Sequence, residues 1–170
     1  MPVTISMYAA SAPVLVQALK GVRIVIDKAE AYARARKVDE AVLLQARIFP
    51  DMFPFVRQCQ IVTDNAKGCV ARLSGQTPPS YEDTEASFEA LRARIDKTIA
   101  YVESFTPEQL DGSEDRDVVL KFPNGQMEFK GQSYLLGFVL PNVFFHAATA
   151  YDLMRQAGVE LTKGDYMGRS

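Results

Sequence analysis

Histidine is nearly absent from this chain of 170 residues, which contains only His146. A zinc centre built from three imidazoles is therefore excluded, because zinc sites take three or four protein ligands. Cysteine is also scarce, and the two residues, Cys59 and Cys69, do not form a CxxC motif. On one helix they would lie roughly 15 Å apart along the axis, too far for a disulfide. We interpret both as reduced, buried thiols.

An excess of positive charge is missing as well. The formal net charge is −2, so no basic field is available to hold nucleic acid or an anionic membrane. Charges or prolines interrupt every apolar run before it reaches membrane-spanning length. The N-terminal stretch MPVTISMYAASAPVLVQALKG lacks the basic start of a secretory signal. We therefore expect a cytoplasmic protein that binds neither nucleic acid nor membranes.

Two common catalytic signatures are also lacking. The glycine-containing stretches LSGQTPP and KGQS do not fit a phosphate-binding loop. No GxSxG motif precedes a helix, so a hydrolase triad has no support.

Amphipathic helical patterns fill most of the chain. Hydrophobic residues make up 48% and charged residues 24%, as in ordinary globular proteins, and the length fits a single domain, residues 1–170. The spacing of apolar residues predicts four helices, over residues 12–37, 39–75, 81–105 and 132–157. Between the last two, DRDVVLKFPNGQMEFKG alternates around Pro-Asn-Gly and predicts a β-hairpin. The predicted fold is all-α, a four-helix bundle with a small hairpin between the third and fourth helices.

Proline, glycine and acidic residues suggest where the helices start and stop. Pro13 suits a first helical turn, Asp39 or a neighbour can cap the second segment, and Asp83 or Thr84 can cap the third. Pro50 and Pro54 interrupt the second segment, which is either a short helix followed by a long one or a single helix kinked at PDMFP. In the last helix, Pro141 lies inside and Gly158 is the expected C-terminal cap.

The last helix places His146 beside an asparagine. Leu135, Asn142 and Thr149 share one seven-residue stripe, and Val139, His146 and Leu153 share the next. We expect both stripes to face the bundle interior. The core anchors should be Leu135, Phe138, Phe145 and Leu153.

Two interpretations of His146 follow from this position. As a core residue, it donates one N–H to a carbonyl such as that of Gly137, which Pro141 leaves without an amide partner, and Asn142 satisfies similar groups. As a functional residue, it needs partners, and the best-placed carboxylate is Asp51, between the two prolines of the second segment. Asp51 can instead cap the helix that restarts after Pro50.

Three stretches resemble a known bacterial family: LLQARIFPDMFPFVRQCQIVTDNAKGCVARLSG, YEDTEASFEALRARIDKT and FKGQSYLLGFVLPNVFFHAATAYDLMRQAGVELTKGDYMG. The patterns PDMFP and LPNxxxHxxTAY are its most specific parts. The chain is identified on them as a member of a family of domains of unknown function in the DinB-like (YfiT-like) four-helix bundle superfamily. The resemblance implies a DinB-like bundle that is commonly dimeric.

The resemblance also implies a metal site in many members, formed by a histidine on the second helix and an HxxxH pair on the last. Some of those members are metal-dependent thiol transferases or isomerases. Here His146 matches the second histidine of the pair, Asn142 stands in place of the first, and the remaining position falls near Asp51 or Met52.

Two classes of function remain on this basis. The first, which we favour, is a metal-independent small-molecule-binding or interaction module with a degenerate metal cleft, forming a homodimer. The alternative is a metal-dependent enzyme with a reduced ligand set of Asp51, Asn142 and His146, or one that uses His146 as a general base oriented by Asp51. No cofactor is predicted, and a divalent metal is disfavoured.

Overall fold

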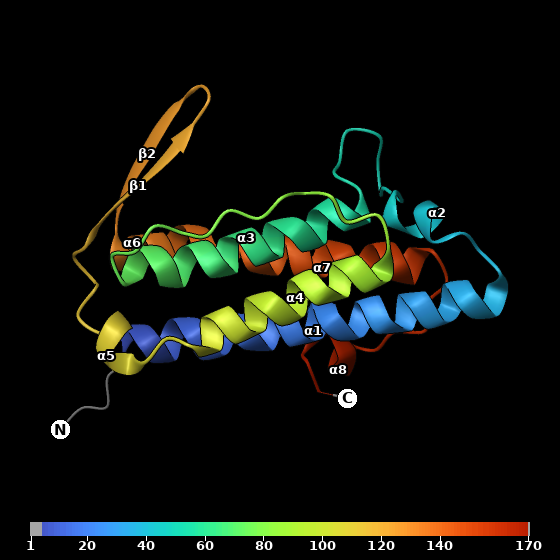
Figure 1. The fold of residues 1–170 in the computed structure, drawn as a ribbon, viewed down its shortest axis with the longest axis horizontal. Coiled ribbons are helices and arrows are strands. Elements are labelled where there is room, and N and C mark those ends of the chain that lie inside the picture. The colour runs from blue at the N-terminus through green and yellow to red at the C-terminus, as the bar shows by residue number, and fades with distance from the viewer. Residues whose placement is uncertain (1–4, 170) are drawn as a thin grey trace.

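Four long helices form the body of the protein in this computed structural model, which describes residues 5–169 (Figure 1). Residues 1–4 and residue 170 lie outside the described residues. Residues 1–4 begin the N-terminal stretch that, from its sequence, we did not expect to be a secretory signal. The predicted four-helix bundle with a hairpin before the last long helix is confirmed. In chain order the elements are α1 (Met7–Arg36), α2 (Glu40–Leu44), α3 (Phe55–Leu73), α4 (Phe88–Glu103), α5 (Pro107–Leu110), β1 (Asp117–Phe122), β2 (Gly125–Lys130), α6 (Gly131–Tyr134), the π-helical turn η1 (Leu135–Val139), α7 (Leu140–Gln156) and α8 (Lys163–Tyr166).

The helices α3 and α4 lie parallel to each other. The connection between them, residues 74–87, runs back along the bundle before α4 begins (Figure 1); we call this segment the strap. The rings of Phe55 and Phe88, the first residues of the two helices, are 6.3 Å apart. Farther along, Arg94 Nε donates to Thr63 Oγ1 at 2.7 Å. The bundle therefore contains a long crossover instead of four helices joined by short turns.

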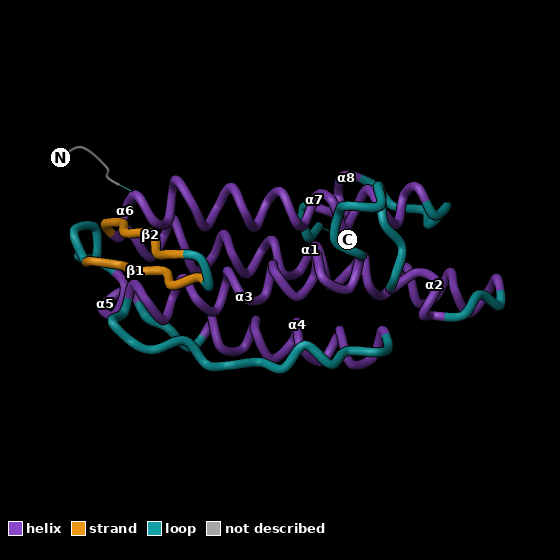
Figure 2. Tube along the Cα trace, turned by 90° about the horizontal axis from the view of Figure 1, so that it is seen from above, coloured by secondary structure: helices purple, strands orange, loops and turns teal. Residues whose placement is uncertain are grey.

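The last helix runs antiparallel to α3, and the tube view shows the long helices side by side (Figure 2). Gln58 pairs with His146 near the start of α3, whereas Arg72 pairs with Tyr134 near its end. The hairpin projects from the end of the bundle where α3 finishes and α6 begins (Figure 1). Sites on the α3–α7 face are consequently bounded by the hairpin at one end and by the α2–α3 connection at the other.

A buried arginine fastens the strap to the helices beneath it. Arg94 on α4 is only 4% exposed. It donates to Asp83 at 2.9 Å and Glu85 at 3.1 Å from the strap, and to Asp64 on α3 at 2.9 Å. Its guanidinium carbon also lies 5.4 Å from the centre of the Tyr81 ring. One cation thus connects three segments, which compensates for its removal from water.

Two of the long helices begin at other residues than the sequence predicted. The first helix begins at Met7, with Ser6 as N-cap, so Pro13 lies inside it and not in its first turn. Pro13 is exposed, which leaves water to satisfy the carbonyl that its ring cannot bond. The third long helix is capped by Ser87, not by Asp83 or Thr84. Asp83 is instead drawn to Arg94.

The second segment is a short helix followed by a long one. Asp39 caps α2 as predicted, its side chain accepting from Ala41 N at 2.9 Å. The prolines break the chain between α2 and α3, because α3 starts only after Pro54, which is its N-cap and offers no side-chain bond. Asp51 lies in the intervening turn, so its predicted role as a helix cap is wrong.

The cysteines lie on α3 as buried thiols, which agrees with the interpretation from sequence. Cys59 and Cys69 are both fully buried and unpaired with each other. Burial raises the pKa of both thiols, that of Cys69 to about 12. Neither sulfur is therefore a thiolate near neutral pH, and both act as small apolar side chains.

The last helix is continuous from Gly131 to Gln156 but contains a π-helical turn directly before Pro141. A proline ring clashes with the carbonyl four residues earlier, and a wider turn relieves that clash. Leu135 and Leu153 are buried as expected. Phe145 is not a core anchor, since it is 58% exposed, and Phe138 is only partly buried.

Candidate functional site

His146 and Gln58 connect the two helices of the α3–α7 face. His146 Nδ1 lies 2.6 Å from Gln58 Oε1, and Gln58 is almost fully buried. The Gln58 amide is oriented by a second bond, in which its Nε2 donates to the Phe53 backbone carbonyl at 2.9 Å. With Oε1 fixed toward the imidazole, Nδ1 must carry the proton that it donates, and Nε2 keeps a lone pair.

The imidazole is held in its neutral form. Burial lowers the pKa of His146, and the positive charge of Arg57 lowers it further. A neutral imidazole with one nitrogen satisfied is a stable structural residue. It also leaves one nitrogen that can accept a hydrogen bond or bind a metal.

Asn142 lies one turn before His146, as predicted, but it serves the backbone. Its Nδ2 donates to the Phe138 carbonyl at 2.7 Å. Asn142 therefore binds a main-chain carbonyl, but not that of Gly137, which Pro141 leaves without an amide partner. The expectation for His146 was wrong in its partner, because the acceptor is the side chain of Gln58 and not the carbonyl of Gly137.

Asp51 does not join this group. It is exposed in the turn between α2 and α3, and no hydrogen bond or ion pair of the described residues connects it to Asn142 or His146. Within residues 5–169, no three His, Cys, Asp or Glu side chains come together in a way that could hold a metal ion. One imidazole with two neutral amides is a poor donor set for zinc, which prefers imidazole, thiolate and carboxylate ligands.

Gln58 is the residue that sequence reasoning missed. It lies three residues after Phe55 and four before Val62, both of which are fully buried. A polar residue at these spacings shares a helix face with the apolar stripe. That pattern could have identified Gln58 as the inward polar side chain of α3.

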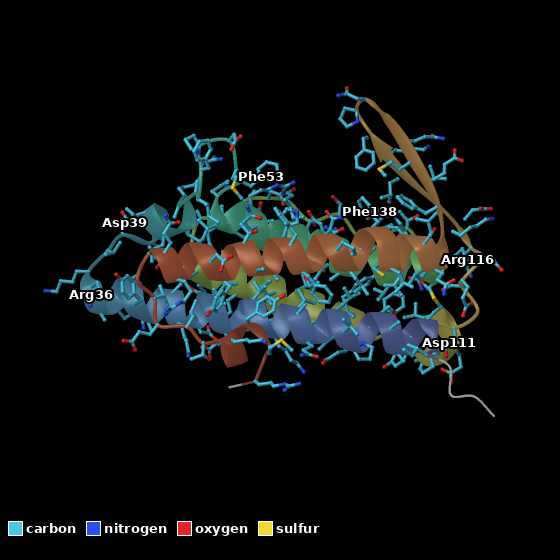
Figure 3. All side chains as sticks on the ribbon, turned by 180° about the vertical axis from the view of Figure 1, so that it is seen from behind. Arg36, Asp39, Phe53, Asp111, Arg116 and Phe138 are labelled. Carbon is cyan, nitrogen blue, oxygen red and sulfur yellow. The ribbon has the colours of Figure 1, made fainter. Side chains whose placement is uncertain are left out.

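An exposed aromatic ring lies beside the His146–Gln58 pair. The Phe145 ring stands edge-on to the imidazole, with centres 5.1 Å apart and planes at 89°. Phe53, whose carbonyl holds Gln58, is 52% exposed. Its side chain lies on the side of the bundle from which the hairpin projects (Figure 3). The imidazole is therefore in contact with an aromatic ring that remains open to solvent.

Comparisons with known proteins agree with this architecture. Residues 7–167 match the family described as Domain of unknown function (DUF1993). A crystal structure of a DinB family member protein from Shewanella denitrificans is 36% identical, with a TM-score of 0.86 over 96% of this chain and 92% of that chain. No curated protein matches. The chain therefore belongs to the DUF1993 family of domains of unknown function, a DinB-like family.

Proposed function

We propose that this protein is a metal-independent small-molecule-binding or interaction module that retains the outline of a metal cleft. The observation that carries this proposal is the pairing of His146 with the neutral amide of Gln58 across α3 and α7. An amide in this place fixes the imidazole without supplying the negative charge that stabilises a bound cation. The exposed ring of Phe145 beside the imidazole suits contact with an apolar ligand or partner.

A metal-dependent or acid–base enzyme is the second candidate, and the free Nε2 of His146 favours it. Metal-binding histidines commonly donate their other ring N–H to a carbonyl, as His146 does to Gln58. The proposed partner Asp51, however, lies on an exposed turn without a bond to the imidazole. The carboxylate that would orient a general base is thus not in place.

Metal content separates these two candidates. Untagged protein dialysed against a mild chelator is expected to retain well below one equivalent of zinc, nickel or manganese, because His146 is the chain's only imidazole. The measurement is elemental analysis by mass spectrometry. A His146→Ala variant serves as the control for adventitious metal. Stoichiometric metal in the natural sequence that disappears in this variant would refute the proposal.

An uncharged outer face on α1 and α7 supports assembly as a homodimer. No charged residue occurs from Met7 to Leu19 or from Leu135 to Tyr151. Phe144 is 41% exposed on this face. A hollow of about 310 Å³ lies between α1, α7 and the C-terminal segment, lined by Val14, Gln17, Ala18, Phe144, Tyr166 and Met167. Interface cores are depleted of charge and enriched in aromatic residues.

The same two helices are long and apolar enough to cross a membrane by length and composition. Of the most apolar 18-residue stretch of each helix, 50% is buried in Met7–Arg36 and 39% in Gly131–Gln156. In this fold both pack against α3 or α4 as core helices. Their remaining apolar surface is what we assign to the second copy.

Light scattering at tens of micromolar is expected to give twice the chain mass of 18.9 kDa. Phe144→Glu should convert the dimer to a monomer, because it places a charge at the centre of the uncharged face. Val42→Glu is the matched control, since Val42 on α2 is also exposed, at 61%, but lies outside that face. A monomeric natural protein, or a Phe144→Glu variant that stays dimeric, would contradict the proposed interface.

A further inference from the structure

Arg72, near the end of α3, is a partly buried cation without an acidic partner. Five arginines of the described chain are not exposed. Four of them form ion pairs with carboxylates: Arg23, Arg57, Arg92 and Arg94. No such pair forms at Arg72 within residues 5–169, where its Nη1 donates only to the Tyr134 hydroxyl, at 3.0 Å. Removing a charge from water without a counter-charge is costly, so a ligand that supplies a negative charge would be stabilised here.

Tyr134 adds a second donor beside this guanidinium. Its side chain is 1% exposed, and burial raises its pKa to about 12, so the hydroxyl keeps its proton. The oxygen accepts from Arg72, and no acceptor for the hydroxyl proton occurs in the part of the chain that the structure describes. A buried O–H normally finds an acceptor. Arg72 and Tyr134 together therefore form a two-donor site that an anionic oxygen would complete.

A groove extends from this pair along α3, beneath the hairpin. It encloses about 260 Å³, and its apolar walls come from Ile61 on α3, Leu120 and Phe122 on β1, and Phe138 in the π-helical turn. Figure 3 shows Phe138 on the side of the bundle from which the hairpin projects. The groove thus combines an anion-binding end with an apolar body, which is a common design of small-molecule sites.

Aromatic packing holds the groove in shape. The ring of Phe129 on β2 is 5.5 Å from that of Phe138 and 5.9 Å from that of Tyr134. Tyr134 and Phe138 stack with centres 6.0 Å apart. These contacts fix the base of the hairpin to the last helix, so the groove is formed before any ligand arrives.

The charges around the groove leave it positive. Arg57, Arg72 and Lys121 line it, against one acid, Asp64. Arg57 is already paired with Asp83, so Arg72 and Lys121 supply the positive charge. The carboxylate of Asp64 is already bound by Arg94 at 2.9 Å and by Lys67 at 3.1 Å. It therefore does not neutralise Arg72.

We infer that this groove binds a small organic carboxylate with an aromatic or branched apolar body. The carboxylate accepts hydrogen bonds from Arg72 and Tyr134, and the body packs between Ile61, Leu120 and Phe138. This inference rests on the proposed binding function and names its ligand class. The site is separate from His146, which does not line the groove.

Calorimetry with 1-naphthoate and its neutral analogue 1-naphthamide tests the inference on the intact chain. Naphthoate should bind at one site per chain, with naphthamide at least roughly tenfold weaker, because only the anion completes the two-donor site. Arg72→Met should weaken naphthoate by at least about tenfold, and Tyr134→Phe by several-fold. Arg155→Met is the control and should bind as the natural protein does, because Arg155 is exposed on α7 away from the groove.

Three results would overturn the inference: no naphthoate binding to the natural protein, equal binding of the acid and the amide, or unchanged binding in both groove variants. Tyr134→Phe removes a single hydroxyl, so it remains informative if Arg72→Met fails to fold. Metal analysis keeps the two proposals apart. If the protein is free of metal and does not bind naphthoate, only the inferred carboxylate site in the groove is refuted. If the protein holds stoichiometric metal and still binds naphthoate, only the proposed metal-independent function is refuted.

Discussion

Replacing Arg94 by methionine is expected to lower the free energy of unfolding by roughly 3–5 kcal/mol, the cost of breaking a buried ion pair by removing one partner. Arg94 donates to Thr63, Asp64, Asp83 and Glu85 from a nearly inaccessible position. The Glu85 side chain is only 10% exposed. Without the arginine, its charge would be left with the amide of Gln60 as its remaining partner.

Urea denaturation followed by circular dichroism measures this loss. The matched control is Arg34→Met, because Arg34 also pairs with a glutamate, Glu30, but has a side chain that is 80% exposed. Surface pairs contribute roughly 0–1 kcal/mol, so this variant should unfold nearly as the natural protein does. Equal losses in the two variants would show that the strap is not held by Arg94. Faster limited proteolysis within residues 74–87 of Arg94→Met would locate the loosened segment.

Leu153→Ala is expected to cost roughly 2–5 kcal/mol, as for other large-to-small changes in a packed core. Leu153 on α7 is 2% exposed, so its removal leaves a cavity among neighbouring helices. Phe145→Ala, eight residues earlier on the same helix, removes a larger side chain but should cost less than about 1 kcal/mol, since that ring is mostly in solvent.

Thermal or urea unfolding of the two variants under identical conditions checks the pair of expectations. The comparison is internally controlled, because both substitutions place alanine in the same helix and share its propensity. A loss at Phe145 as large as that at Leu153 would mean that the ring is buried in the folded protein in solution. The orientation of α7 described above would then be wrong.

The fold could be predicted from sequence because its signals are local. Helical spacing of apolar residues, the alternation around Pro-Asn-Gly, and the Asp39 cap each depend on a few neighbouring residues. The helix starts were less certain because several neighbouring residues can serve as caps. Asp83, Thr84 and Ser87 can all cap a helix, and the structure uses Ser87 while Asp83 binds Arg94, 11 residues later on α4.

The candidate site was predicted on only one of its two helices. Periodicity placed Asn142 and His146 on the inner part of α7, and the same spacing rule applies to Gln58 on α3, but it could not pair Gln58 with His146, which is 88 residues away in the chain. Phe145 was misplaced because the uncharged run from Leu135 to Tyr151 is apolar on most of its circumference. In such a helix hydrophobicity does not distinguish the side facing the core from the side facing solvent.

The crossover made by the strap also constrains how the chain can fold. Two consecutive antiparallel helices can pair early as a local hairpin, but α3 and α4 are parallel and cannot meet until the strap has traversed the bundle. The contacts of α1 are equally remote, as its Arg23 pairs with Asp96, 73 positions later. Closing such loops costs entropy before any contact is gained. We therefore expect a transition state assembled from distant segments, and slower folding than in an up-and-down bundle of the same length.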